Sequence, residues 1–239
     1  MGSVRRPHYI ADPLDFQPPG KFAARMTPER FRRLRDVLVR RQPDLTVLME
    51  RVNKAHNFSA ILRNCDAAGV LRAHVVPPDG GVGVHHQIAA GSTRWVPVTR
   101  HASTAAAFEA VRESGLRLLA AHPGPEAVDY REVDFTRPTC IVMGAELHGV
   151  SDEGLDSVDE QVVVPMEGFV RSFNVSVAAA LLLMEARHQR AAAGMYDSSR
   201  LESDEFDRTL FEWAYPREAR NFRREGRPYP DLAEDGSWI

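Results

Sequence analysis

The sequence is poor in cysteine, with only two such residues among 239. Cys65 falls in a predicted helix and Cys140 in a predicted strand, and neither belongs to a CxxC pair or a Cys/His ligand spacing. Structural zinc sites need such clusters, and disulfide-stabilised secreted domains carry many more cysteines. We therefore expect a reduced intracellular protein that binds no metal.

Long apolar segments are also missing. The longest, residues 175–184, is interrupted only by Ser176, and it is far shorter than the roughly 20 apolar residues of a membrane-spanning helix. The N-terminus MGSVRRPHYIADP has two arginines with no apolar segment behind them, so we expect no signal peptide. The composition, 44% hydrophobic and 26% charged, is that of an ordinary soluble protein. We expect a cytoplasmic location and no membrane partner.

Several common catalytic signatures do not occur. No Ser-His-Asp order, HExxH or paired-carboxylate spacing is found, which weakens hydrolytic interpretations. No strand is followed by GxGxxG, which counts against a conventional dinucleotide site. Gly144-x-x-x-x-Gly149 is followed by Val-Ser, whereas a P-loop requires Lys-Ser or Lys-Thr. A phosphate-cradling NTPase is therefore disfavoured.

Charge is unevenly distributed along the chain. The net charge is −3, yet residues 1–41 hold ten bases and four acids, a net +6, while residues 197–239 hold seven bases and eleven acids, a net −4. Thr27-Pro28-Glu29 has the residues of a helix start, and the helix it predicts is apolar on one face and rich in arginine elsewhere. A solvated surface helix is the simpler interpretation, but the few opposing acids favour a surface that binds nucleic-acid phosphates.

From residue 45 onward, short apolar runs alternate with helical patterns. This alternation is typical of an α/β architecture with a mostly parallel sheet. The last core helix is expected to end at Gly194, residues 1–26 are expected to be an irregular extension, and residues 197–239 a helical appendage. The predicted strands are 45–50, 73–78, 94–98, 116–122, 139–144 and 161–166, and the predicted helices of the core are 58–69, 103–114 and 175–193.

Three polar stretches lie next to predicted strands, where open α/β sheets bind ligands. In HNFSAILRNCD (56–66), Asn57 is placed to cap a helix, and Arg63 is either a solvent-facing arginine or a site residue. In CIVMGAELHGVSDEG (140–154), two glycines permit close approach of the backbone to a ligand, and Glu146 is a solvated carboxylate or part of that site.

The third stretch runs from residue 161 into the last core helix. Asn174 is well placed to cap this helix. Capping explains Asn174 or Ser172, but hardly both of them together with Arg171 and the loop Pro165-Met166-x-Gly168. The cluster is therefore either a cap or a site, and capping alone explains it poorly.

Together the three stretches resemble the SpoU/TrmH family of RNA 2′-O-methyltransferases. Asn57-Phe-Ser-Ala60-Ile-Leu-Arg63 is similar to the N-x-x-A-x-x-R motif of that family, and Ile141-Val-Met-Gly144-Ala-Glu146-Leu-His-Gly149 to its glycine-rich loop. Pro165-Met166-Glu-Gly168 and Ser172-Phe173-Asn174-Val-Ser-Val resemble its third motif. RRQPDLTVLME (40–50), TRPTCIVMG (136–144) and AGMYD (193–197) are similar to the TrmH branch, which methylates guanosine at tRNA position 18.

The resemblance implies a SPOUT-type α/β fold, with a mostly parallel sheet, helices on both faces and a C-terminal trefoil knot. It implies three parts: a basic N-terminal extension and helix (1–44), a knotted methyltransferase domain (45–196) and a C-terminal helical appendage (197–239). It also implies a homodimer that acts on tRNA with S-adenosylmethionine as cofactor. Alternatives are a ribosomal RNA 2′-O-methyltransferase, and a catalytically silent RNA-binding relative or RNA chaperone.

The resemblance also implies roles for individual residues. Because a guanidinium stays protonated in proteins, Arg63 is a poor base. We expect it to clamp a phosphate and stabilise the developing alkoxide, oriented by Asn57. The implied catalytic residues are Asn57, Arg63, Glu146, Ser172 and Asn174; the cofactor-binding residues are Ala121, Gly144, Glu146, Gly149, Val164, Met166 and Phe173; and the RNA contacts are Arg30, Arg33, Arg40, Arg41 and His56.

Overall fold

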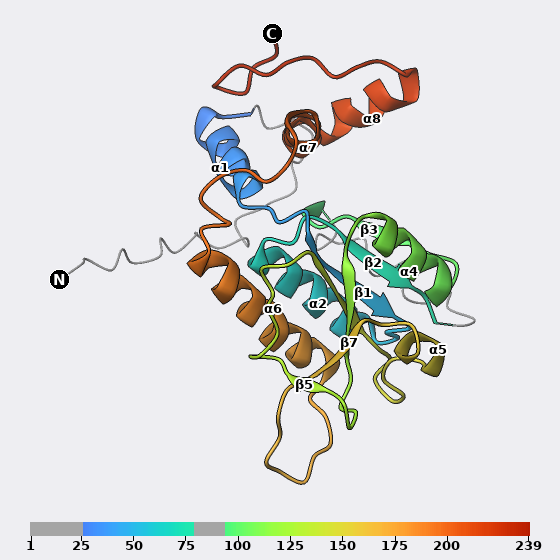
Figure 1. Ribbon diagram of the computed structural model, residues 1–239. Coiled ribbons are helices and arrows are strands. Elements are labelled where there is room, and N and C mark those ends of the chain that lie inside the picture. The colour runs from blue at the N-terminus through green and yellow to red at the C-terminus, as the bar shows by residue number, and fades with distance from the viewer. Residues whose placement is uncertain (1–25, 79–93) are drawn as a thin grey trace, which may run out of the picture.

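A single parallel sheet of seven strands forms the centre of the molecule (Figure 1). The computed structural model describes residues 26–78 and 94–239, so the predicted irregular extension falls almost wholly outside the described residues. The strand order is β3-β2-β1-β6-β4-β7-β5. The strands are β1 (Leu45–Glu50), β2 (Ala73–Val76), β3 (Val98–Arg100), β4 (Arg117–Ala121), β5 (Val128–Asp129), β6 (Thr139–Met143) and β7 (Glu160–Val163).

Helices cover both faces of this sheet, as predicted. On one face α2 (Ala55–Ala68) packs beside α6 (Val175–Ala192), and on the other lie α4 (Thr104–Glu113) and α5 (Asp152–Leu155). Every residue of β1 and β6 is buried. Val47 and Met49 belong to the core under α2 and α6, while Leu48 belongs to the core under α4. Burial on both faces explains why these strands are continuously apolar instead of alternating.

The helices near the two chain ends form a third hydrophobic cluster. Phe31 and Leu38 of α1 (Pro28–Val39) share it with Leu210 and Trp213 of α7 (Ser203–Ala214), and α8 (Pro216–Glu225) packs beside α7. The predicted basic N-terminal helix and C-terminal helical appendage are thus confirmed as helices, and they contact each other. The division of the chain at residues 44 and 196 stays a prediction.

Some predicted boundaries were wrong. The strand expected at 94–98 begins only at Val98, because Pro97 has no N–H to donate to a ladder and the Trp95 ring packs on Trp213 with centroids 5.2 Å apart. The first core helix starts at Ala55, not at 58. Asn57 therefore lies inside it, and its predicted role as the cap of this helix was wrong. The two-residue edge strand β5 was missed because it has no apolar run.

The strand order reverses direction between β1 and β6. From β1 the strand order runs outward through β2 and β3 on one side and through β6 and β4 on the other. The carboxyl ends of neighbouring strands at such a reversal are where open α/β sheets bind ligands. The predicted trefoil knot stays a prediction about the path of the chain. None of the helices within the described ranges is long and apolar enough to span a membrane.

Candidate active site

Glu146 lies in the loop that follows β6, and its carboxylate binds the start of helix α2. Its carboxylate accepts hydrogen bonds from the backbone N–H of Asn53 (3.2 Å) and Lys54 (3.0 Å) and from Nδ2 of Asn57 (2.8 Å). Lys54, the N-cap residue of α2, offers no side-chain cap of its own, so a carboxylate distant in sequence serves the amide groups that a helix start leaves without partners. Burial alone would raise the pKa of Glu146, but these donated hydrogen bonds outweigh it and lower that pKa.

Asn57 connects Glu146 to the start of helix α6. Its side chain is 1% exposed, and its Oδ1 accepts a hydrogen bond from Nδ2 of Asn174 at 3.1 Å. Asn174 is the N-cap of α6, as predicted, and its Oδ1 accepts from the backbone N–H of Ser176 at 2.9 Å and from the Ser176 hydroxyl at 2.7 Å. One continuous chain of hydrogen bonds, Glu146 to Asn57 to Asn174, therefore joins the three sequence motifs.

The loop that carries Glu146 is tightly closed. Ala145 and Gly149 exchange two backbone hydrogen bonds of 2.9 and 2.8 Å, and Gly149 has φ +69°, where glycine is favoured. A Cβ atom on Gly144 would lie 1.9 Å from the carbonyl carbon of Gly149, so only glycine fits. Both glycines are needed to form the turn that presents Glu146 to α2.

Arg63 lies on the exposed surface of α2. It makes no hydrogen bond or ion pair with any residue in the described ranges. Its neighbour Asn64 donates from Nδ2 to the carbonyl oxygen of Ser176 at 2.9 Å. Asn64 thus fixes α2 against the start of α6, a role that sequence reasoning missed because helical spacing does not show which helix packs on which.

The predicted cofactor residues fall into two groups. Ala121 at the end of β4 and Val164 just after β7 pack against the same hydrophobic core, and Gly144 follows the neighbouring β6. Met166 and Phe173 lie on the segment between β7 and α6, which projects from the body in Figure 1. The structure brings the first group together at adjacent strand ends, and it does not include the second group in that core.

Ser172 lies on the same projecting segment. It is exposed and makes no hydrogen bond to any residue in the described ranges. The structure therefore gives it no part in capping α6, where Asn174 acts alone.

Four of the predicted RNA contacts lie at least partly at the surface: Arg30, Arg33, Arg40 and His56. The fifth prediction, Arg41, is contradicted. Its side chain is 1% exposed, its Nη1 donates to the carbonyl oxygen of Val70 at 2.9 Å, and its guanidinium pairs with Asp66 and lies 5.2 Å from the Trp213 ring centroid. A buried guanidinium with these partners has no free surface for a phosphate. Arg41 instead fixes the helical cluster to the core.

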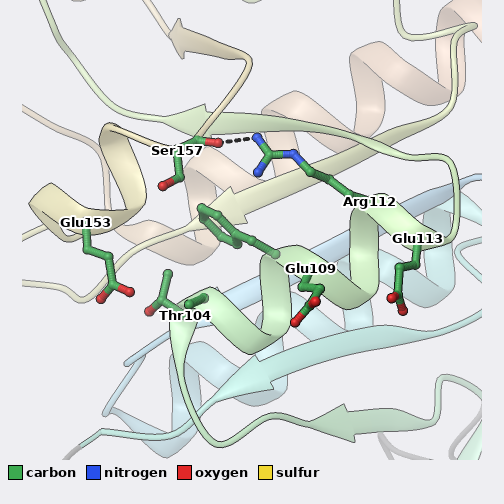
Figure 2. A pocket seen from close by; sticks show the side chains of 8 residues that line it. Thr104, Glu109, Arg112, Glu113, Glu153 and Ser157 are labelled. Atoms are coloured by element: carbon green, nitrogen blue, oxygen red, sulfur yellow. Dashed lines mark hydrogen bonds between the residues drawn. The ribbon is translucent and has the colours of Figure 1, made fainter.

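A separate hollow of about 500 Å³ lies between α4 and α5. Arg112, Glu109 and Glu153 line this hollow. Figure 2 shows that Arg112 donates a hydrogen bond to the carbonyl oxygen of Ser157. Because α4 covers the opposite face of the sheet from α2 and α6, this hollow is not part of the hydrogen-bonded chain through Asn57. No group of three metal-ligating side chains occurs in the described parts of the chain.

The arrangement is suited to holding ligands and orienting them. Neither cysteine is a nucleophile here, because both are buried and burial raises the pKa of Cys65 to about 12. Glu146, with a lowered pKa and three donors on its carboxylate, is a poor proton acceptor. Arg63, exposed on α2, is a hydrogen-bond donor and a cation.

Comparison with known proteins gives two family matches. The SpoU rRNA Methylase family matches residues 44–184, and the SpoU rRNA methylase C-terminal family matches residues 188–239. The tRNA (guanosine(18)-2′-O)-methyltransferase of Escherichia coli K12 is 46% identical over 213 residues, covering 88% of this chain and 93% of that protein.

Solved structures agree with these matches. The Aquifex aeolicus TrmH/SpoU tRNA modifying enzyme aligns with a TM-score of 0.72 at 40% identity, covering 79% of this chain and 96% of that one. The SpoU methyltransferase AviRb from Streptomyces viridochromogenes in complex with AdoMet aligns with a TM-score of 0.56 at 29% identity, covering 63% and 62% of the two chains.

Proposed function

This chain belongs to the SpoU rRNA methylase family, and we propose that it methylates the 2′-hydroxyl of guanosine at position 18 of tRNA with S-adenosylmethionine as the methyl donor. The likeness to the E. coli enzyme over 93% of that enzyme's length supports this substrate. The observation that carries the proposal is the hydrogen-bonded chain from Glu146 through Asn57 to Asn174, because it joins the glycine loop, α2 and α6 into one site.

The residues at the strand ends fit the cofactor. Ala121 and Val164 are apolar and only partly buried, which suits a flat heteroaromatic ring, and the closed 144–149 loop offers backbone groups for its polar edges. S-adenosylmethionine, when bound, supplies an activated methyl group on a sulfonium. Gly144, Glu146 and Gly149 would shape the pocket, and Met166 and Phe173 of the projecting segment would complete it.

In the proposed mechanism Arg63 binds the RNA phosphate beside the target ribose and stabilises negative charge as the 2′-oxygen loses its proton. The proton goes to the phosphate or to water. Asn57 and Glu146 hold the start of α2, and Asn174 and Asn64 hold α6 beside it, so that Arg63 is fixed relative to the cofactor loop. Ser172, on the projecting segment, would line the pocket floor.

Arginines at the surface support the tRNA partner. Arg33 and Arg40 of the N-terminal helix region are exposed, as is His56 at the start of α2. Arg217, Arg220 and Arg224 of α8 are exposed at positions i, i+3 and i+7, which place them on one helix face. We propose that these two helical surfaces, with Arg30, bind backbone phosphates and set the position of the tRNA without reading its sequence.

We also propose a homodimer, because large apolar side chains are exposed near the site. Phe169 and Val170 on the projecting segment are 109% and 66% exposed, and Val177 and Met184 of α6 are 44% and 40% exposed. A second copy of the chain would remove this surface from water. We further propose that the protein is cytoplasmic and that the chain divides into three parts, with boundaries after residues 44 and 196.

The test is methyl transfer from labelled S-adenosylmethionine to RNA that lacks the modification, with tRNA and ribosomal RNA separated. Label in tRNA, mapped to a guanosine ribose in the D-loop, supports the proposal. Label only in ribosomal RNA would replace it with the ribosomal alternative, and failure to bind the cofactor in a calorimeter would replace it with the silent RNA-binding alternative.

A further inference from the structure

Glu50, the last residue of β1, is a buried carboxylate that the mechanism above does not use. It is 1% exposed. Its Oε2 accepts from the backbone N–H of Ser151 at 2.9 Å, and its Oε1 accepts from the hydroxyls of Ser151 (2.6 Å) and Thr104 (2.5 Å). Its hydrogen-bonding donors thus come from two segments distant in sequence, and both carboxylate oxygens are occupied.

Ser151 lies at the end of the glycine loop, directly before α5. It follows Gly149 and the buried Val150, and it is the N-cap of α5, accepting from the N–H of Gly154 at 3.2 Å. Because the backbone N–H and the hydroxyl of Ser151 both donate to Glu50, this carboxylate holds the chain in place just after the 144–149 turn. The hydroxyl of Thr104, at the start of α4, donates to Oε1 of Glu50, the same oxygen that accepts from the Ser151 hydroxyl.

Glu50 and Glu146 both link the glycine loop to the part of the chain around the end of β1 and the start of α2. Glu50 reaches from β1 to the loop, and Glu146 reaches from the loop to the start of α2. Glu50, the last residue of β1, binds the end of the glycine loop. Glu146 lies in the glycine loop and binds Asn53 and Lys54, which connect β1 to α2, and Asn57 in the first turn of α2. The loop is therefore fixed at its tip and at its end to the segment that leads into α2.

The backbone next to Glu50 provides an independent observation. Arg51 has φ +54°, the one non-glycine residue with positive φ in the described ranges. A side chain larger than glycine is strained there and keeps this conformation only where the surroundings impose it. The N–H of Arg51 donates to the carbonyl oxygen of Val76 at 2.8 Å, so the turn after Glu50 is held from both sides at the cost of local strain.

We propose that Glu50 is a positioning residue for the cofactor loop. Through Ser151 it holds the 144–149 turn in the conformation that receives S-adenosylmethionine, without touching the cofactor itself. This inference rests on the proposed function for the identity of the ligand. Its physical basis is preorganisation: a loop already ordered in the free protein loses less conformational freedom when a ligand binds.

The test compares Glu50→Gln with a control of similar structural severity. Glutamine keeps the volume of the side chain but replaces one acceptor with a donor, which faces either the Ser151 N–H or the two hydroxyls. Ser103→Ala is the control, because it removes the N-cap hydrogen bond of the neighbouring helix α4 to the N–H of Ala106 (3.2 Å) and leaves Glu50 untouched. Ser151→Ala, a milder change at the same contact, keeps the test decisive if Glu50→Gln folds poorly.

Calorimetric titration of each variant with S-adenosylmethionine, well below its melting temperature, is the first readout. We expect the dissociation constant to rise about tenfold in Glu50→Gln and Ser151→Ala, with no further rise in the double variant, and to stay within about twofold of wild type in Ser103→Ala. Equal affinities in Glu50→Gln and wild type, or an equal loss in Ser103→Ala, would overturn the inference. Absence of binding by the wild-type protein would instead contradict the proposed function.

Amide hydrogen exchange in the cofactor-free protein is the second readout. Glu50→Gln is expected to speed exchange at the N–H groups of Ser151 and Gly149 at least tenfold, while the N–H groups of β4 exchange as in wild type. Unchanged exchange at Ser151 would show that Glu50 does not hold the loop, whatever the cofactor is.

Discussion

Asn174 donates a hydrogen bond to Asn57 at 3.1 Å across 117 residues of sequence. Each side chain uses both its amide nitrogen and its amide oxygen, because Asn57 also donates to Glu146 and Asn174 also accepts from Ser176. Few other pairs of residues could replace these two asparagines, because each position needs a hydrogen-bond donor and an acceptor on one short side chain. This contact fixes the start of α6 relative to α2, and the following predictions depend on it.

Replacement of Arg63 tests the chemistry. Arg63→Ala is expected to lower kcat by about 10²–10³-fold, the usual loss for a preorganised charged donor, with an unchanged affinity for S-adenosylmethionine. Arg63→Lys, which keeps the charge and loses the planar fork, should recover only part of this loss. Single-turnover methylation measures both. Arg131→Lys, at an exposed ion pair with Asp129, is the control, and wild-type turnover in Arg63→Ala would exclude Arg63 from the reaction.

Two substitutions at Asn174 separate its capping role from its contact with Asn57. Asn174→Ala removes both and should lower the free energy of unfolding by about 1 kcal/mol. Asn174→Ser keeps a capping oxygen but has no amide to donate to Asn57. We expect its stability to stay near that of wild type while its methylation rate falls at least about tenfold. Denaturant unfolding and turnover, measured together, check this; parallel recovery of both in the serine variant would show that only capping matters.

Arg41 and Arg33 should behave in opposite ways. Arg41→Ala removes a fully buried side chain that packs on the Trp213 ring and should lower the free energy of unfolding by about 2–4 kcal/mol. Arg33→Ala, at an exposed position, should change stability little while it weakens tRNA binding and reduces the slope of log affinity against log salt by about one. Filter binding at several salt concentrations provides the slopes, and equal slopes for wild type and Arg33→Ala would remove this helix from the interface.

Stability should fall as the pH drops from about 6.5 toward 4. Burial, the neighbouring His101 and Arg72 lower the pKa of His74 from 6.5 to about 4, so the unfolded chain binds a proton in this range before the folded chain does, and protonation favours unfolding. The loss between pH 7.5 and 4.5 is on the order of 2 kcal/mol. His74→Gln should reduce the difference between the two pH values, and His188→Gln, at an exposed site, should not. Identical pH profiles for wild type and His74→Gln would contradict this.

Much of the fold was predictable because its signals are local. The apolar runs of β1 and β6 are continuous since both faces of each strand are covered. Helix α6 begins directly after Asn174, the residue that caps it. Trp95 shows the limit: it was assigned to a strand by its neighbours Val96 and Val98, but its ring packs on Trp213 of a helix distant in sequence.

The sequence motifs indicate candidate site residues, but they do not indicate which of those residues contact one another. Asn57 and Glu146 were predicted to be site residues, yet no sequence spacing indicates that Asn57 donates a hydrogen bond to Glu146, 89 residues away. Arg41 looked like its exposed neighbour Arg40 because both continue a basic run, and only the packing of α7 and the end of α2 against it determines its burial. The role of Glu50 was not predictable, because its hydrogen-bond donors Thr104 and Ser151 are distant in sequence.

The most direct measurement of the central claim is methyl transfer to two synthetic tRNA transcripts that differ only in the sugar of guanosine 18. One carries ribose at this position and the other carries 2′-deoxyribose. We predict that the labelled methyl group appears on the first transcript, at that nucleotide, and that the second takes up none. Equal labelling of both transcripts, or labelling of neither while ribosomal RNA is methylated, would contradict the account.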